Sequence, residues 1–256
     1  MDQSIDKTLV IGEYPAILVS SGKVTKFNDT VCVEQSVRLY LNDEFLVELI
    51  ASPVQLKELG AGFVICEGWA QEIEAVDQKE NEIRVWAPAN KIQRWVLDSG
   101  GGLHAKGMPR KVTASLTIEP ADVYRIMREI ESDIWKKTGA VHSAVLFTEG
   151  SLVVRSNDVG RHNTVDKAVG FAILNGVDLS KCVIGCSGRQ PAGMVAKAAN
   201  AGIPIIISKA ASTDKGILTA EEAGITLICF ARGDRFTIYT HPHRVAGVLE
   251  QISQYK

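Results

Sequence analysis

Apolar and polar residues alternate along much of the first fifty positions, a pattern typical of half-buried β-strands. The pattern predicts strands at residues 31–34, 37–41 and 45–50. A helix with Pro53 in its first position should follow and should end near Gly68. Residues 73–86 then predict a second hairpin. We therefore expect a small α+β subdomain over residues 1–97.

Downstream of residue 110, short and almost wholly apolar runs alternate with stretches of helical periodicity. The expected strands are residues 144–147, 152–156, 182–186, 203–207, 225–230 and 236–239. The expected helices are residues 120–137, 165–173, 191–198 and 218–223, with a last one from about residue 245. Strands that alternate with helices predict a mostly parallel sheet covered on both faces. We expect an α/β domain over residues 111–256.

Between these two parts, residues 98–110 contain four glycines and a proline, which favour an irregular connection. Two interpretations stay open for this glycine-rich loop: a linker between subdomains, or a mobile loop that closes over a ligand. A P-loop is excluded, because no Lys-Ser or Lys-Thr pair follows the glycines.

Composition and charge narrow the class of protein. The chain has 256 residues, of which 46% are apolar, enough for a substantial core. Its formal net charge of −2 gives no general attraction to nucleic acid or to anionic membranes, so neither is an expected partner. No apolar run reaches the roughly 18–20 residues of a membrane span, and residues 1–7 contain acidic residues where a signal peptide would have positive charge. We expect a cytoplasmic protein.

Several kinds of chemistry can be set aside. The five cysteines are odd in number and include no Cys-x-x-Cys pair, which argues against a disulfide framework or a zinc ribbon. We interpret them as small buried hydrophobic residues. His142 lacks the glutamate that a zinc deaminase needs two positions later. His241 and His243 lack a third ligand and are interpreted as part of a turn, so no metal site is predicted.

The densest polar cluster lies between a predicted strand and a predicted helix, at residues 157–167. Gly160 permits a turn there, and Arg161 and His162 follow it. The start of a helix offers free backbone N–H groups and the positive end of its dipole, which together favour an anion. The alternative is a capped turn, in which Asp158 or Asn163 only satisfies backbone donors.

Similar residues follow the other predicted strands. The exits carry Asp158, Arg161 and His162; Ser187, Gly188 and Arg189; Ser208, Lys209, Ser212 and Thr213; and Arg232 and Arg235. In open α/β sheets the ligand binds outside the carboxyl ends of the strands. Arginine, serine and helix N-termini that converge there predict a site for an extended anion such as a phosphate or a diphosphate. The alternative is that these basic residues pair with surface carboxylates.

These motifs resemble a known family over nearly the whole chain beyond about residue 30. The matching segments are residues 67–68, 158–163, 165–167, 187–189, 201–204, 224–227 and 230–232. They are similar to the formate dehydrogenase accessory sulfurtransferases. The resemblance implies a cytidine-deaminase-like α/β fold, with a three-layer core, a mixed sheet and the smaller N-terminal α+β subdomain. It also implies a homodimer without deaminase chemistry.

The resemblance further implies a function. Proteins of this family carry sulfur from a cysteine desulfurase to the molybdenum cofactor, Mo-bis(molybdopterin guanine dinucleotide), so that formate dehydrogenase becomes active. Formate dehydrogenase and a cysteine desulfurase are thus the expected partners. The family's cofactor-contacting segment maps onto residues 230–235. Together with the strand exits, the candidate cofactor-binding residues are Arg161, His162, Ser187, Gly188, Arg189, Lys209, Phe230, Ala231, Arg232, Gly233, Asp234 and Arg235.

One departure from the family pattern bears directly on catalysis. Members that transfer sulfur carry a Cys-x-x-Cys in the glycine-rich loop, and its first cysteine holds the persulfide. The matching positions here are Gly101 and His104, and a glycine has no thiolate to accept sulfur. Two hypotheses remain: a sulfurtransferase that uses another thiol, for which Cys186 is the candidate next to a strand exit, or a non-catalytic protein that binds and delivers the cofactor or a guanine nucleotide.

Overall fold

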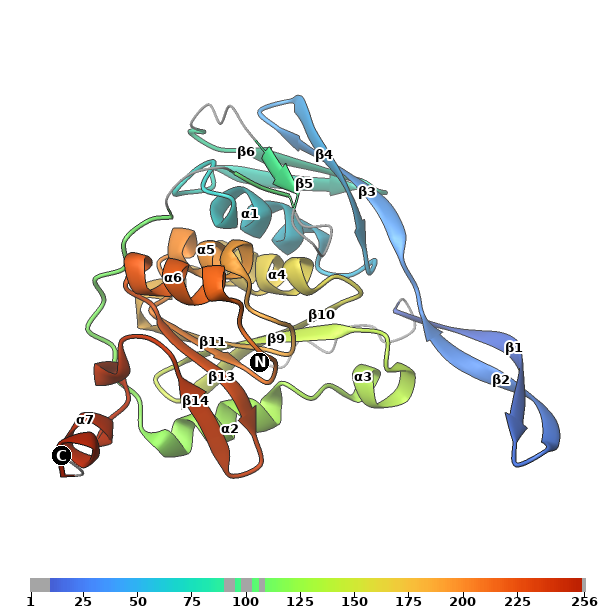
Figure 1. Ribbon diagram of the computed structural model, residues 1–256. Helices are drawn as coiled ribbons and strands as arrows, with labels where there is room; N and C mark the ends of the chain where they lie inside the picture. Colours follow the sequence, from blue (N-terminus) through green and yellow to red (C-terminus); the bar gives the residue numbers. More distant parts are fainter. Residues whose placement is uncertain (1–9, 90–94, 98–102, 106–108, 255–256) are drawn as a thin grey trace.

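The computed structural model describes residues 10–89, 95–97, 103–105 and 109–254. The main sheet consists of β9 (His142–Thr148), β10 (Ser151–Asp158), β11 (Cys182–Cys186), β12 (Ile205–Ser208), β13 (Thr226–Arg232) and β14 (Arg235–Ile238). The spatial order is β10-β9-β11-β12-β13-β14 (Figure 1). The three central strands β11, β12 and β13 are parallel, whereas β9 runs antiparallel to both of its neighbours and β14 runs antiparallel to β13. The sheet is therefore mixed.

Helices cover both faces of this sheet. The helices beyond residue 110 are α2 (Pro120–Glu129), α3 (Asp133–Thr138), α4 (Arg161–Leu174), α5 (Ala192–Ala201), α6 (Asp214–Ala223) and α7 (Val248–Gln254), with the 3₁₀ turns η2 (Leu179–Lys181) and η3 (Pro242–Arg244). Figure 1 shows α4, α5 and α6 on one face and α2 on the other. Each face has its own buried cluster, around Val169 and Val195 on one side and around Ile126 and Ile130 on the other. The predicted α/β class with a three-layer core is confirmed.

A second, smaller sheet lies over the helical layer. Its strands are β3 (Gln35–Leu41), β4 (Glu44–Ala51), β5 (Ala75–Lys79) and β6 (Glu82–Trp86), and the helix α1 (Leu56–Cys66) follows β4 in the chain. The strands are ordered β4-β3-β6-β5, and α1 lies between them and the helices α4 and α5 (Figure 1). Leu39, Leu59 and Ile83 are fully buried in a core of their own. This is the smaller α+β unit that the alternating pattern predicted.

Two glycines set how closely the two units approach. A Cβ atom on Gly62 of α1 would lie 1.7 Å from the backbone oxygen of Asp166, and one on Gly170 of α4 would lie 1.8 Å from that of Glu58. The backbones of α1 and α4 are therefore in direct contact. A side chain of any size at either position would push the helices apart.

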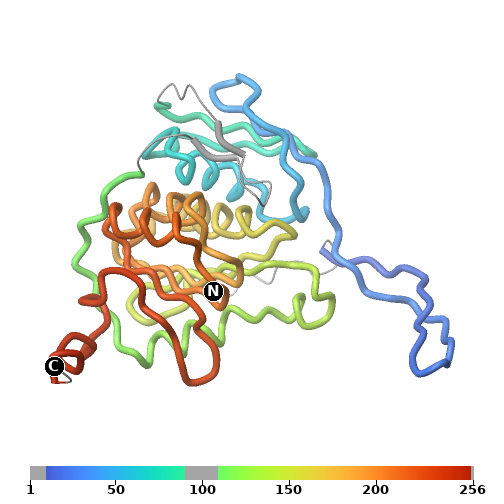
Figure 2. Tube along the Cα trace, viewed as in Figure 1, coloured from blue at the N-terminus to red at the C-terminus, as the bar shows by residue number. Residues whose placement is uncertain are grey.

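The first described strands form an arm. β1 (Ile11–Ser20) and β2 (Lys23–Cys32) pair antiparallel and project from the body (Figure 2). Ile17, Val19 and Val24 are each more than 60% exposed on it. Among the described residues, no helix is both long and apolar enough to cross a membrane.

Part of the expected glycine-rich loop is a strand. β7 (Trp95–Leu97) pairs antiparallel with β8 (Leu103–Ala105), and His104 stands opposite Val96 in this ladder. Gly101 lies outside the described residues. The division into residues 1–97, 98–110 and 111–256 stays a prediction.

Two predicted helix boundaries are wrong. The first helix begins at Leu56 and not at Pro53, because Gln55 has a left-handed φ of 53° and separates the proline from the helix. The predicted helix 120–137 is two helices, broken after Glu129. Ser132 starts the second one by accepting a hydrogen bond from the backbone N–H of Trp135 at 3.1 Å. Apolar periodicity continues across this break, so the pattern alone did not reveal it.

Candidate functional site

The carboxyl ends of β10, β11, β12 and β13 lie along one edge of the main sheet, together with the first residues of β9 and β14. The ladder register fixes this, because Asp158 is paired with His142 and Cys186 with both Ala144 and Ser208. The predicted convergence of the strand exits is thus confirmed. β10 and β13 run two residues further than predicted, so Asp158 and Arg232 belong to strands and not to loops.

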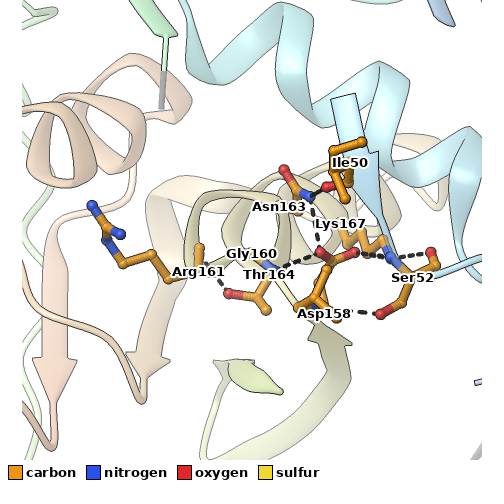
Figure 3. A network of polar contacts seen from close by, with 9 residues as sticks. Ile50, Ser52, Asp158, Gly160, Arg161, Asn163, Thr164 and Lys167 are labelled. Carbon is orange, nitrogen blue, oxygen red and sulfur yellow. Dashed lines mark hydrogen bonds and ion pairs between the residues drawn. The ribbon is translucent and has the colours of Figure 1, made fainter. Parts of the chain in front are cut away.

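Asp158 is the centre of a buried polar network (Figure 3). One carboxylate oxygen accepts hydrogen bonds from Lys167 Nζ at 2.5 Å and from the backbone N–H of Ser52 at 3.0 Å. The other accepts from the backbone N–H of Gly160 and from Asn163 Nδ2, both at 2.8 Å. These contacts use the lone pairs of the carboxylate, so it has no capacity left for an external ligand.

The same network joins α4 to the end of β4. Lys167 Nζ also donates to the carbonyl of Ser52 at 3.0 Å, and Asn163 Nδ2 donates to that of Ile50 at 2.8 Å. Burial lowers the pKa of Lys167, and the charge of Asp158 opposes that shift. Asp158 and Asn163 therefore satisfy internal donors and acceptors, as the capped-turn alternative proposed, and they hold the smaller sheet in place.

A second buried network begins one residue earlier on α4. Lys197 is fully buried and contacts Asp166 at 2.8 Å and Glu67 at 2.5 Å. Burial alone would lower the pKa of Lys197, but the charges of Asp166 and Glu67 outweigh it and leave that pKa raised. The lysine is thus cationic and links α5 with α4 and the end of α1.

Arg161 belongs to the polar cluster at residues 157–167, but its side chain lies on the other side of the cluster from Asp158 (Figure 3). It is the first residue of α4, and its side chain points away from the Asp158 network (Figure 3). A Cβ atom on Gly188 would lie 2.9 Å from Arg161 Cβ and 3.1 Å from its Cδ. Glycine at position 188 therefore lets the Arg161 side chain lie against the exit loop of β11. His162, the next residue, is only 8% exposed.

Ser187 is held by the strand that pairs with β11. Its Oγ accepts a hydrogen bond from the backbone N–H of Ser143 at 2.9 Å and lies 3.2 Å from Nδ1 of His142. His142 was interpreted from the sequence only with regard to a deaminase zinc site, so its contact with Ser187 was not predicted. The signal was present, since the first residue of an antiparallel strand lies at the same edge as the last residues of its neighbours.

The basic residues at the edge differ in their partners. Lys209 forms an ion pair with Glu131, and the hydrogen bond and charge from Lys209 lower the pKa of Glu131. Arg232 donates from Nε to the carbonyl of Lys209 at 2.7 Å. Within the described ranges, no carboxylate lies within ion-pair distance of Arg189, Arg232 or Arg235. The surface-pairing alternative therefore applies to Lys209.

Residues 230–235 form the end of β13, a turn and the start of β14. Phe230 has a left-handed φ of 52° and is 40% exposed, and Gly233 supplies the turn with a φ of 59°. Arg232 and Arg235 stand opposite each other in the ladder. Ala231 is buried in the core, whereas the carbonyl of Asp234 accepts a hydrogen bond from the Tyr124 hydroxyl at 2.9 Å. The segment thus presents an aromatic ring and two guanidinium groups.

The model of the FdhD/NarQ family matches residues 32–246. The chain belongs to the FdhD/NarQ family. This confirms the resemblance that was based on the strand-exit motifs.

Individual FdhD/NarQ proteins are similar over most of their length. Protein FdhD of Methanocaldococcus jannaschii is 37% identical over 232 residues, which are 87% of this chain and 97% of that protein. The sulfur carrier protein FdhD of Wolinella succinogenes is 34% identical over 236 residues, covering 85% of this chain and 82% of that protein. A crystal structure from Desulfotalea psychrophila, described as that of a formate dehydrogenase accessory protein, matches with a TM-score of 0.78, 27% identity and coverage of 92% and 99%.

Four of the five thiols of this FdhD/NarQ protein lie in unreactive surroundings. Cys66, Cys182, Cys186 and Cys229 are buried. Burial raises the pKa of Cys182 to about 11 and that of Cys186 and Cys229 to about 12, and it also raises the pKa of Cys66. Cys32 is half-buried and its Sγ lies 3.1 Å from Thr138 Oγ1. Because the thiolate is the reactive form, the buried thiols are poor nucleophiles at neutral pH.

Proposed function

We propose that this protein is an accessory protein of formate dehydrogenase that binds Mo-bis(molybdopterin guanine dinucleotide) at the edge formed by the ends of β10 to β13. The cofactor is its cargo. The membership of the FdhD/NarQ family and the name of the relative from Desulfotalea support the accessory role. Formate dehydrogenase is the partner that follows from it. A homodimer and a cytoplasmic location stay predictions.

The observation that carries the proposal is the gathering of arginines at one sheet edge in a chain of net charge −2. Arg161 lies against the exit of β11, and Arg232 reaches the exit of β12, the neighbouring strand. Adjacent strands are about 4.8 Å apart, so a diphosphate can bridge the two exits. Each guanidinium offers a planar set of donors that suits phosphate oxygens.

Sulfur transfer is supported less well than binding. Relatives that carry the name sulfur carrier protein favour it, with a cysteine desulfurase as the donor. Against it stand Gly101 and His104 at the positions of the family's cysteines, and the raised pKa of each of the four buried thiols. These observations favour a second candidate function, in which the protein binds and delivers the cofactor without holding a persulfide.

Calorimetric titration with GDP, the nucleotide half of the cofactor's dinucleotide arms, tests the binding proposal. Arg161→Ala and Arg232→Ala should each weaken binding by about 1.5–3 kcal/mol, because each removes a charge-assisted hydrogen bond to phosphate. Arg38→Ala on the smaller sheet is the control and should bind GDP like the parent. Unchanged affinity in both edge variants would contradict the proposed site.

A further inference from the structure

His142 occupies a central position at the basic edge. It is the first residue of β9, which lies between β10 and β11, and it stands opposite Asp158 in the ladder. Its side chain is half-buried. The ring therefore lies between the exit that carries Arg161 and the exit that carries Ser187.

The Ser187 hydroxyl holds one nitrogen of this ring. The Ser187 Oγ accepts from the backbone N–H of Ser143, and the Ser187 backbone N–H donates to the Ser143 carbonyl at 3.0 Å. The Ser187 Oγ also lies 3.2 Å from Nδ1 of His142, and its hydroxyl proton is available to that nitrogen in a neutral ring. A neutral ring that accepts at Nδ1 carries its proton on Nε2.

The surrounding groups favour this neutral ring. Burial is the largest cause that lowers the pKa of His142, and the positive charge of Arg161 lowers it further. Asp158 opposes the shift, and His162 adds to it. The negative charge of the Asp158 carboxylate is itself balanced by Lys167. The positive charge of Arg161 therefore dominates the electrostatic potential at the ring.

The second ring nitrogen has no partner in the part of the chain that the structure describes. The contact with Ser187 uses Nδ1, and no described group lies within hydrogen-bond distance of Nε2. A donor of this kind, beside Arg161 and in a site that gathers arginines, is suited to an anionic oxygen.

We propose that His142 is a ligand-contacting residue of this site: Nδ1 holds the Ser187 hydroxyl, and the Nε2–H donates to a phosphate oxygen of the bound nucleotide. The proposal rests on the proposed function and adds a donor that the strand-exit rule had not included. A phosphate next to the ring also favours the imidazolium, so binding should draw a proton onto His142 as the pH falls.

Two amide variants separate the roles of the two ring nitrogens. The shorter amide of His142→Asn reaches the position of Nδ1 and can hold Ser187, but it places no donor at the position of Nε2. The longer amide of His142→Gln places an N–H near the position of Nε2. His243→Gln, in η3 beyond the opposite edge of the sheet, is the matched control.

The experiment is calorimetric GDP binding by the full chain at pH 8 and pH 6, with thermal unfolding as a check on folding. At pH 8, His142→Gln should bind GDP within about threefold of the parent and His142→Asn about tenfold more weakly, as expected for one lost hydrogen bond to a charged group. Between pH 8 and pH 6 the parent and His243→Gln should gain more affinity than His142→Gln, since only His142→Gln lacks the ring that takes up the proton. The titration of GDP itself is common to all of them.

Three results would overturn this assignment. His142→Asn could bind as tightly as the parent at both pH values, both amide variants could lose affinity equally, or the parent and His142→Gln could have the same pH dependence. Each of these leaves the proposed function intact. If the folded parent does not bind GDP at all, the proposed function fails together with this assignment.

Discussion

At the scale of single residues, the polar motif at the start of α4 divides into an inward and an outward half. Asp158 and Lys167 form an ion pair with no solvent exposure, and Asn163 completes their hydrogen bonds. Arg161 points the other way and lies over Gly188. Two charges this deep are tolerated because they pair with each other and with buried hydrogen-bond partners, so removing one charge leaves the other at full desolvation cost.

The first prediction concerns this ion pair. Lys167→Met should lower the free energy of unfolding by about 3–5 kcal/mol, because the Asp158 carboxylate would remain buried without its cation. Urea unfolding followed by circular dichroism measures the loss. The control is Lys136→Met, whose pair with Asp133 is exposed and 3.9 Å long, and its effect should stay within about 0.5 kcal/mol. Equal stability of the two variants would mean that the buried pair contributes little.

At the scale of elements, the contact between α1 and α4 decides how the smaller sheet is attached. Gly62 and Gly170 let the two backbones touch, and the networks around Asp158 and Lys197 flank this contact. The two helices can approach this closely only where both glycines meet. The glycines therefore fix the position of α1 on α4, and the buried ion pairs on either side stabilise the same position.

The second prediction reverses the usual effect of a glycine-to-alanine change in a helix. Alanine normally favours a helix by up to about 1 kcal/mol over glycine. Gly62→Ala should instead destabilise the protein by at least about 3 kcal/mol, because its Cβ would overlap a backbone oxygen that cannot move aside. Thermal unfolding provides the measurement, with Lys57→Ala on the exposed side of α1 as control. A stabilised Gly62→Ala protein would show that the helices are further apart than described here.

The elements also show what a sequence can and cannot reveal. The apolar runs predicted the parallel strands β11, β12 and β13 because burial on both faces leaves a clear local pattern. The break at Ser132 was missed, since one capping side chain ends a helix without changing its apolar period. The capped-turn alternative included the inward role of Asp158, but its partner Ser52 was not predicted because it is 106 residues away in sequence. Local patterns thus predicted the elements and the basic edge, whereas long-range contacts decided which polar residues point into the protein.

At the scale of the whole molecule, the packed layers provide stability and the edge between them holds the proposed binding residues. The smaller sheet, α1 and the helices α4 and α5 form a continuous packed block with buried ion pairs (Figure 1). The opposite face of the main sheet is covered by α2. The edge between these layers holds the arginines, while the buried thiols lie within the layers. The fold thus favours the binding of an anion, because the arginines lie at the edge, over the storage of sulfur, because the four buried thiols lie inside the layers.

The third prediction concerns sulfur. After incubation with a cysteine desulfurase and cysteine, mass spectrometry of the parent should show no persulfide, since Gly101 and His104 replace the family's cysteines and the four buried thiols have raised pKa values. The double variant Gly101→Cys and His104→Cys, which restores the family's cysteines, should gain about 32 Da, the mass of one sulfur atom on a thiolate. A persulfide on a native cysteine of the parent would return the protein to the sulfurtransferases.

We expect an extended anion to bind where the strand exits converge, and a crystal structure of the protein with GDP checks this expectation. The diphosphate should lie at the carboxyl ends of β11 and β12, within hydrogen-bond distance of Arg161 and Arg232. A diphosphate bound elsewhere on the molecule, with this edge empty, would contradict it.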